Sequence, residues 1–443
     1  MRAETVSRHL AEAARAIAVA ILERAEAGGV RGEILEQARA DLQLGDELAA
    51  VADFDQAIPA YGDVLKAADT LVFDMDLFEQ DIRDRFDPKT VGYAYAVNRD
   101  GSLQRQGAGG ELSQDGTFNG LARTSVDAPE TQQAPDKELH IASVSKTITA
   151  VAVLKLLQDT GVGIDNTVGP YLPPEWELGD GVGAITFREL MTHRSGLANN
   201  SKPFSDFASL QAAVAVDIDS DLTQDPDLPG LKKFTYQNAN YGLFRIIIPY
   251  LWDINPQTFP GQDLELVTAA INNYFVQTEI FEPMGIVADC KPNDDTQTLL
   301  YPFPSGNTNG YQSKDGCLGC GPGCWYLSVY ELANFLANLR FNDDILNQDT
   351  RNLMDTLFLG WMDPANANSY AFANGAFGVY RAHSGDVSYT GGRAVHTCIM
   401  NFPTLVSGAV PIAVQASVII NSSLAGSQCG ALKNAFDSAW VTN

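Results

Sequence analysis

A serine and a lysine three residues apart give the strongest chemical signal in the sequence. Ser143 and Lys146 stand near the start of segment 140–157, which changes from small and hydroxyl residues to an apolar run. If this segment is a helix, the two side chains lie on one face. Desolvation of a buried lysine disfavours its charged form, and a neutral amine can take the proton of a serine hydroxyl. The pair predicts a nucleophile and its activating base, although a helix-capping serine followed by a solvent-facing lysine has the same spacing.

Tyr236, Gln237 and Asn238 form a second candidate group, because they precede the apolar run 243–251. A tyrosine beside a cationic lysine loses its proton more easily, so Tyr236 can serve as a general base or proton relay. Asn238 offers a donor and an acceptor to a substrate amide or carbonyl. The alternative is an aromatic residue at a helix start followed by an asparagine turn.

The third group, Tyr389-Thr390-Gly391-Gly392, lies in the strand-rich last part of the chain. Its two glycines would let a substrate approach the backbone closely, with Tyr389, Thr390 and Gly391 lining the site. The N–H groups of Gly392 and Ser143 would then form an oxyanion hole. The alternative is a Gly-Gly bulge in a sheet.

A rival for this third position exists at His383-Ser384-Gly385. The sequence 384–386, Ser-Gly-Asp, is typical of a hairpin turn, and strand patterns flank it on both sides. This interpretation favours Tyr389 over His383. Trp325 is a further candidate for the pocket wall through its apolar face, and it fits a core position equally well.

The order of the predicted elements indicates how these residues are positioned. Strand patterns occur at 91–97 and in the segments 377–382, 387–390, 394–401 and 414–421, whereas the middle of the chain has helical periodicity. We therefore expect an α/β (α+β) fold with one antiparallel sheet built from both ends of the chain, flanked by terminal helices, and an all-helical lobe inserted between them.

These patterns also predict the domain organisation. Residues 1–74 form a helical extension, in which the sequence shows no polar constellation and which is expected to serve packing or dimerisation. Residues 75–443 form the catalytic domain. Its sheet lobe comprises about 75–140 and 371–443, and its helical lobe about 141–370.

Composition narrows the class of partner. The chain has 443 residues and a net charge of −26, from 55 acidic and 29 basic residues. Nucleic acids and anionic membranes require positive surface, so neither is an expected partner. The sequence contains no segment of membrane-spanning length and no leader pattern, which predicts a cytoplasmic protein, or a periplasmic or secreted one if a leader is missing.

Six cysteines raise the question of a metal site. Cys317, Cys320 and Cys324 lie close together, but no fourth ligand has suitable spacing, and glycines are interleaved with them. We therefore predict no metal and no cofactor. A turn with ordinary thiols and a local disulfide both remain open.

Taken together, the motifs resemble the superfamily of serine β-lactamases and penicillin-binding proteins. The likeness is greatest to the class C β-lactamase-like branch, which includes family VIII carboxylesterases and D-aminopeptidases, and it runs from about residue 78 to 440. It rests on segments 141–147, 185–197, 236–238, 281–286, 325–332 and 389–392.

The resemblance implies a β-lactamase/transpeptidase-like fold and a role for each residue. Ser143 would be acylated, Lys146 would activate it, and Tyr236 would relay the proton. Asn238 would contact the acyl side of the substrate. The N–H groups of Ser143 and Gly392 would form the oxyanion hole.

One departure from the family pattern affects the expected substrate. β-Lactamases and peptidases of this superfamily carry Lys-Thr-Gly at the third motif, where the cation helps to bind a substrate carboxylate. Tyr389 in that place favours a carboxylesterase or amidase acting on uncharged acyl groups. The alternatives are a β-lactamase or D-Ala/D-amino-acid peptidase, and a non-enzymatic acylation sensor or scaffold. The expected ligand is a small ester, amide or lactam, and self-association through the N-terminal helices is a further expectation.

Overall fold

A computed structural model describes most of the chain. The described residues are 2–27, 33–64, 71–110, 117–118, 121–122, 133–197, 206–259, 261–292, 298–304, 310–313, 316–366, 368–407 and 410–442. The loop-rich sequences of segments 199–233 and 292–323 predict that they shape the pocket. Both segments lie partly outside the described residues.

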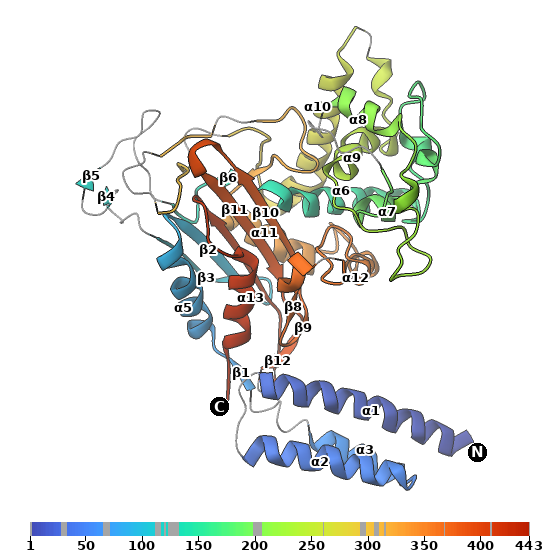
Figure 1. The fold of residues 1–443 in the computed structure, drawn as a ribbon, viewed down its shortest axis with the longest axis vertical. Helices are drawn as coiled ribbons and strands as arrows, with labels where there is room; N and C mark the ends of the chain where they lie inside the picture. The colour runs from blue at the N-terminus through green and yellow to red at the C-terminus, as the bar shows by residue number, and fades with distance from the viewer. Residues whose placement is uncertain are drawn as a thin grey trace.

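A five-stranded antiparallel sheet forms the centre of the molecule (Figure 1). Its strand order is β10-β11-β14-β2-β3, so strands from both ends of the chain pair directly, as predicted. The strands are β2 (Tyr93–Arg99), β3 (Ser102–Gly109), β10 (Arg381–Ser388), β11 (Ala394–Asn401) and β14 (Val414–Ile420). Every residue of β14 is buried, because helices cover both faces of the sheet.

Helices α5 (Met75–Phe86) and α13 (Gln428–Ser438) cover one face of the sheet, and α11 (Val329–Phe341) covers the other (Figure 1). Side chains of the sheet fasten α11: Gln415 donates to the carbonyl of Leu336 at 2.7 Å, and Ser417 to that of Val329 at 3.1 Å. Helix α11 thus packs on the sheet, although it lies within the segment 141–370 that was assigned to the helical lobe.

The helical lobe lies beside the sheet and is built around α6 (Ser145–Thr160) (Figure 1). Twelve of the residues of α6 are buried, from Ser145 to Leu157, so this helix is enclosed on all sides. The other helices of this part of the chain are α7 (Phe187–Met191), α8 (Phe207–Val214), α9 (Asn238–Leu251), α10 (Leu264–Val276) and α12 (Gln348–Leu357). Of these, α9 and α10 contact α6, and α7 and α8 pack on α9.

Short two-stranded sheets form outside the central sheet. They are β1 (Leu71–Phe73) with β15 (Trp440–Thr442), β4 (Thr117–Phe118) with β5 (Leu121–Ala122), β6 (Leu139–His140) with β7 (Tyr326–Leu327), β8 (Asn374–Gly375) with β9 (Gly378–Val379), and β12 (Leu405–Ser407) with β13 (Val410–Ile412).

The prediction of a hairpin turn at Ser384–Asp386 is wrong. Residues 381–388 form one continuous strand, β10, whose eight residues pair in unbroken register with β11 from Arg381↔Asn401 to Ser388↔Ala394. The turn lies instead at Thr390–Gly392, where Gly391 and Gly392 have φ of +74° and +75°. Glycine tolerates this left-handed backbone, so the two glycines are explained by the turn.

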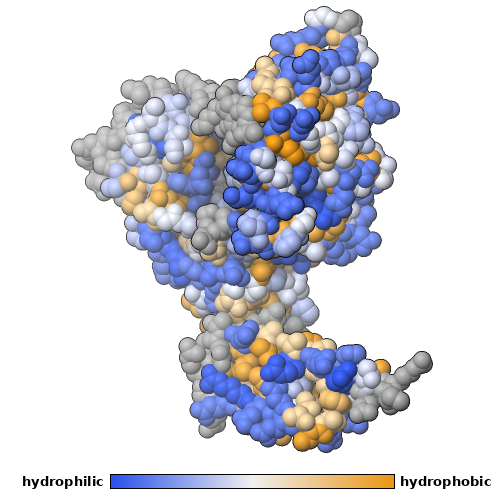
Figure 2. Space-filling model, turned by 45° about the vertical axis from the view of Figure 1, so that its right-hand side comes forward, coloured by the Kyte–Doolittle hydropathy of each residue, from blue (hydrophilic) through white to orange (hydrophobic). Residues whose placement is uncertain are grey.

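The N-terminal extension is a separate group of helices beneath the sheet lobe, α1 (Arg2–Ala27), α2 (Glu33–Ala50) and α3 (Phe54–Asp63) (Figure 1). Asp46 joins all three, because it pairs with Arg15 at 2.7 Å and accepts a hydrogen bond from Tyr61 at 2.8 Å. Figure 2 shows hydrophobic and hydrophilic residues mixed on its surface. Self-association through these helices stays a prediction. Among the helices described, none is long and apolar enough to span a bilayer.

All six cysteines are paired. The disulfides are Cys290–Cys320, Cys317–Cys324 and Cys398–Cys429. The sequence left two alternatives open for the cysteines at 317–324, ordinary thiols in a turn or a local disulfide. The structure has the local disulfide, Cys317–Cys324. Within the described residues, no group of His, Cys, Asp or Glu side chains is arranged to hold a metal ion.

Candidate active site

Ser143 lies on a tight turn that connects β6 to α6. It is the middle residue of the 3₁₀ turn Ala142–Val144, directly before Ser145 begins the helix. Ala142 has φ of +51°, a left-handed conformation that costs a non-glycine residue about 1 kcal/mol. The imidazole of His140 stabilises this turn, since its Nδ1 accepts a hydrogen bond from the N–H of Ala142 at 3.0 Å. The turn presents the serine hydroxyl at the N-terminal end of α6.

The structure brings Ser143, Lys146 and Tyr236 together. Nζ of Lys146 lies 3.0 Å from Oγ of Ser143, and the hydroxyl of Tyr236 donates to the same Oγ at 2.9 Å. The lysine side chain is fully buried, with its Nζ 5.0 Å from the centre of the Tyr236 ring. Lys146 also donates to the carbonyl oxygen of Pro322 at 2.7 Å. An amine, a hydroxyl and a phenol from segments 93 residues apart thus meet at one point.

Burial sets the protonation of these groups. It lowers the pKa of Lys146 well below the usual lysine value, and it raises the pKa of Tyr236. At neutral pH these directions favour a neutral amine and a protonated phenol. The sequence analysis gave Lys146 two possible states, a neutral base for Ser143 and a cation that helps Tyr236 to lose its proton. The lowered pKa of Lys146 agrees with the neutral base, and the raised pKa of Tyr236 favours a proton donor over a base.

Gly385 of β10 lies against the backbone of Ser143. A side-chain carbon added at Gly385 would collide with the carbonyl oxygen of Ile141 and would lie 3.1 Å from the amide nitrogen of Ser143. Two residues earlier, His383 lines the same cavity as Tyr236 and is buried. The segment His383-Ser384-Gly385 therefore occupies the third-motif position, and the preference for Tyr389 is wrong.

The segment Tyr389–Gly392 lies away from the nucleophile. Tyr389 accepts a hydrogen bond from Ser313 at 3.3 Å and packs on Tyr311, with ring centres 5.8 Å apart. Thr390, Gly391 and Gly392 are exposed in the turn after β10, and Pro302 is the residue nearest to Gly392 on its side-chain side. The prediction that the N–H groups of Gly392 and Ser143 form an oxyanion hole is therefore wrong, because Gly392 lies in the exposed turn after β10.

The free edge of β10 offers a different oxyanion donor. The carbonyl of Ala382 accepts a hydrogen bond from Met362 at 2.9 Å, so the backbone groups of Ala382 point away from β11. Because backbone orientation alternates along an antiparallel strand, the N–H of Asp386 points to the same free edge. This edge is where Gly385 meets Ser143, which makes the N–H groups of Ser143 and Asp386 the candidate pair.

The two remaining predicted site residues differ in position. Trp325 is 1% exposed and packs edge-on against Phe281, with ring centres 4.9 Å apart, so it belongs to the core. Its carbonyl accepts a hydrogen bond from Ile141 at 2.9 Å and so holds the segment before Ser143. Asn238 is half-buried at the first residue of α9, two residues after Tyr236.

His193 also lies at this site, although the sequence analysis did not name it as a candidate. It follows α7 with φ of +57°, and its ring packs on that of Tyr236 with centres 4.3 Å apart. Its Nδ1 accepts a hydrogen bond from the N–H of Gln237 at 3.3 Å. Burial lowers its pKa well below the usual histidine value, so a neutral ring holds the phenol in place. The sequence signal for His193 was its position in segment 185–197, which is one of the segments that carry the family resemblance.

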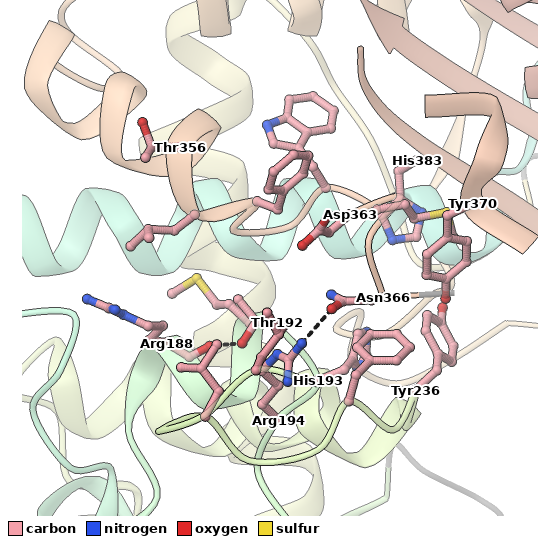
Figure 3. Close-up of a pocket in the computed structure, with 18 of the residues that line it drawn as sticks. Arg188, Thr192, His193, Arg194, Tyr236, Thr356, Asp363, Asn366, Tyr370 and His383 are labelled. Carbon is pink, nitrogen blue, oxygen red and sulfur yellow. Dashed lines mark hydrogen bonds between the residues drawn. The ribbon is translucent and has the colours of Figure 1, made fainter. Parts of the chain in front are cut away.

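A cavity of about 220 Å³ opens beside Tyr236 and His383 (Figure 3). Its walls are mainly apolar and aromatic, and include Phe234, Phe358, Trp361 and Tyr370. Figure 3 shows Tyr236, Tyr370 and His383 at one end, with Arg188 and Thr356 toward the other.

The cavity's arginines have partners. Arg194 pairs with Asp225 at 2.6 Å and donates to Asn366 at 2.5 Å, and Arg188 pairs with Asp165 at 2.6 Å. Their charges are therefore balanced by carboxylates.

Replacement of Gly385 by alanine is expected to reduce kcat about 100-fold, because the added methyl group forces β10 and the Ser143 turn apart by a fraction of an ångström or more. Gly62→Ala is the control, since no atom lies within 4 Å of the added carbon there. Steady-state kinetics on both variants, with thermal unfolding to verify folding, make the comparison. A Gly385→Ala enzyme with wild-type kcat would contradict the packing described for β10.

The chain is similar to one known protein family and to several solved structures. Residues 75–251 match the family model described as Beta-lactamase. No curated protein matched the sequence. Among solved structures, the chain is similar to a β-lactamase/D-alanine carboxypeptidase from Pseudomonas syringae, with 16% identity, a TM-score of 0.54, and coverage of 82% of this chain and 97% of that one.

Two further solved structures have the same fold. A class C β-lactamase from Rhodobacter sphaeroides has 16% identity, a TM-score of 0.51, and coverage of 82% of this chain and 97% of that one. The octameric penicillin-binding protein homologue from Pyrococcus abyssi has 18% identity, a TM-score of 0.50, and coverage of 81% and 74%.

Proposed function

We propose that this chain is a serine hydrolase of the β-lactamase and penicillin-binding-protein superfamily and acts as a carboxylesterase on small uncharged substrates. The match of residues 75–251 to the Beta-lactamase family model and the likeness in fold to solved structures support this proposal. The nucleophile is Ser143, and the reaction passes through an acyl-enzyme. The geometry that supports this is the contact of Ser143 with a neutral amine and a protonated phenol.

Among the residues described, no unpaired cation lies beside the nucleophile. This observation supports the proposal that the substrate is uncharged. His383 stands where relatives that bind a substrate carboxylate carry lysine, and burial lowers its pKa to about 3. Lys146 is held neutral by burial, and Arg194 is paired with Asp225. A charged carboxylate entering such a site would lose its hydration without gaining a partner, whereas an uncharged ester would not.

In the acylation step the Ser143 hydroxyl gives its proton to Nζ of Lys146 as Oγ bonds to the ester carbonyl carbon. The N–H groups of Ser143 and Asp386 stabilise the negative oxygen that forms. Tyr236 donates its proton to the departing alcohol oxygen and regains one from Lys146. The bond between carbonyl carbon and alcohol oxygen breaks, which leaves an acyl-serine and a free alcohol. Water then attacks the acyl-serine by the reverse relay, releasing the carboxylic acid and restoring Ser143.

A substrate panel tests this function. We expect kcat/KM for p-nitrophenyl acetate or butyrate to exceed that for nitrocefin, a lactam with a carboxylate, by at least about 100-fold. The uncharged methyl ester of a D-alanyl peptide is expected to react faster than the corresponding free acid. A high rate on nitrocefin with negligible ester turnover would overturn the carboxylesterase assignment in favour of a β-lactamase.

A further inference from the structure

The carbonyl oxygen of Pro322 has a defined place in the site. It accepts a hydrogen bond from Nζ of Lys146 at 2.7 Å, while the same Nζ lies 3.0 Å from Oγ of Ser143. A neutral amine has one lone pair, and its direction depends on where the N–H bonds point. With one N–H directed at Pro322, the lone pair can face the serine hydroxyl. The position of this carbonyl therefore controls the alignment of the base.

Pro322 lies in a segment without helix or strand that two disulfides cross-link. Cys317–Cys324 closes a short loop around Pro322. Cys290–Cys320 ties the middle of that loop to a segment about 30 residues earlier, and the N–H of Cys317 donates to the carbonyl of Cys290 at 2.9 Å. Cross-links restrict the conformations open to such a segment. This double cross-link substitutes for the regular structure that the loop lacks.

Hydrogen bonds fasten the same loop to two helices. Thr149 of α6 donates to the carbonyl of Gly321 at 2.7 Å, one turn after Lys146. From α10, Asn272 donates to the carbonyl of Cys320 at 2.8 Å, and Asn273 to that of Leu318 at 2.9 Å. The acceptors are all backbone carbonyls, so their placement depends on the path of the loop and not on its side chains.

We infer that the Cys317–Cys324 disulfide is a positioning element of the active site, which holds the Pro322 carbonyl where it aligns Lys146 with Ser143. The oxidised form is the fully active form. A dithiol that gives two electrons and two protons to this disulfide leaves two cysteine thiols, becomes a disulfide itself, and releases the loop. The inference rests on the proposed role of Lys146 as the base.

The cysteines of the Cys317–Cys324 disulfide are more exposed to solvent than those of the other two disulfides. Cys317 and Cys324 are half-buried, whereas Cys290, Cys320, Cys398 and Cys429 are each 1% exposed or less. Thiol–disulfide exchange requires access to a sulfur atom, so a dithiol reaches Cys317–Cys324 first. Disulfides persist in oxidising compartments, where the loop would stay closed.

Release of the loop also changes the surroundings of Lys146. The groups that face its amine are Ser143, the phenols of Tyr236 and Tyr241, and the imidazoles of His193 and His383. None of these is a carboxylate. Water admitted by a loosened loop would therefore favour the charged amine, and the acid limb of the pH–rate profile would move to higher pH.

The test compares the folded enzyme before and after mild treatment with dithiothreitol, and the Cys317→Ser/Cys324→Ser variant. Iodoacetamide labelling and peptide mapping identify the reduced pair. We expect selective labelling of Cys317 and Cys324, a 10- to 100-fold loss of kcat with KM changed less than about threefold, and an acid limb shifted to higher pH. Reoxidation should restore the wild-type enzyme. Treatment should have no further effect on the variant.

Labelled enzyme that keeps its kcat and pH profile would overturn the inference, even if the variant fails to fold. Labelling of a fluorophosphonate probe at Ser143 and the activity of Lys146→Met are measured in parallel. If Lys146→Met retains wild-type activity, the proposed function itself fails. If Lys146→Met is inactive while the reduced enzyme reacts normally with probe and ester, only the role of the disulfide fails.

Discussion

Ser143→Ala is expected to lower kcat/KM for ester hydrolysis by about 10⁴-fold or more, because no acyl-enzyme can form without the hydroxyl. The change removes one oxygen that lies 3.0 Å from Lys146 and 2.9 Å from Tyr236, and it leaves the turn and helix intact. The free energy of unfolding should change by no more than about 1 kcal/mol. Steady-state kinetics with p-nitrophenyl butyrate and thermal unfolding measure the two effects.

Ser438→Ala is the matched control for this variant. Ser438 lies at the end of α13 and donates only to the carbonyl of Asn434, at 2.8 Å, away from the site. Its loss should leave kcat/KM unchanged. Retention of activity within tenfold of wild type by Ser143→Ala would mean that another residue is the nucleophile.

Lys146→Met is expected to lower kcat about 1,000-fold or more and at the same time to stabilise the protein. In the unfolded chain a lysine is charged at neutral pH, with a pKa near 10.4, whereas burial lowers the pKa of Lys146 in the fold. Folding must therefore remove a proton, which methionine avoids. We therefore expect the free energy of unfolding of Lys146→Met at pH 7 to exceed that of the wild type, even after allowance for the lost hydrogen bond to Pro322.

The size of this stabilisation depends on pH. Between the lowered pKa and the ordinary one, the unfolded state binds more protons than the folded state, so wild-type stability rises with pH. The advantage of Lys146→Met should shrink as pH rises from 7 toward 10. Lys155→Met on the same helix is the control, since Lys155 pairs with Asp159 at 2.6 Å and should keep activity. A Lys146→Met protein that is less stable at every pH would contradict a neutral buried amine.

Local spacing was enough to predict that Ser143 and Lys146 lie in contact. Ser143 and Lys146 are three residues apart, so any helix through them sets their contact. Tyr236 lies 93 residues further on, and its contact with Ser143 depends on α9 packing against α6. The resemblance of segment 236–238 to a known motif supplied what spacing could not.

The third motif shows where local signals fail. Ser384-Gly385-Asp386 has the residue types of a turn, but pairing along β11 keeps all eight residues of β10 extended. The Gly-Gly pair at 391 and 392 was the true turn. Which glycine lies against Ser143 follows from the register of an edge strand, and residue type alone does not reveal that register.

Trp325 and His193 show a related limit of sequence patterns. For Trp325 the sequence left a pocket wall and a core position open, and the structure has the core position; His193 was not among the candidates. The identity of an aromatic residue or a histidine does not reveal whether its side chain lines a pocket or packs behind one. Trp325 contributes its carbonyl while its ring fills the core, and His193 contacts Tyr236 only because the left-handed backbone after α7 turns its ring that way. Such roles depend on backbone direction at single residues.

The most direct test of the account is the mass of the enzyme during turnover. The protein is mixed with excess p-nitrophenyl butyrate, quenched in acid within seconds, and analysed by intact-mass spectrometry and peptide mapping. The account predicts a butyryl adduct on the peptide that contains Ser143, absent from Ser143→Ala. An adduct on another residue, or steady turnover by Ser143→Ala with no adduct at all, would contradict it.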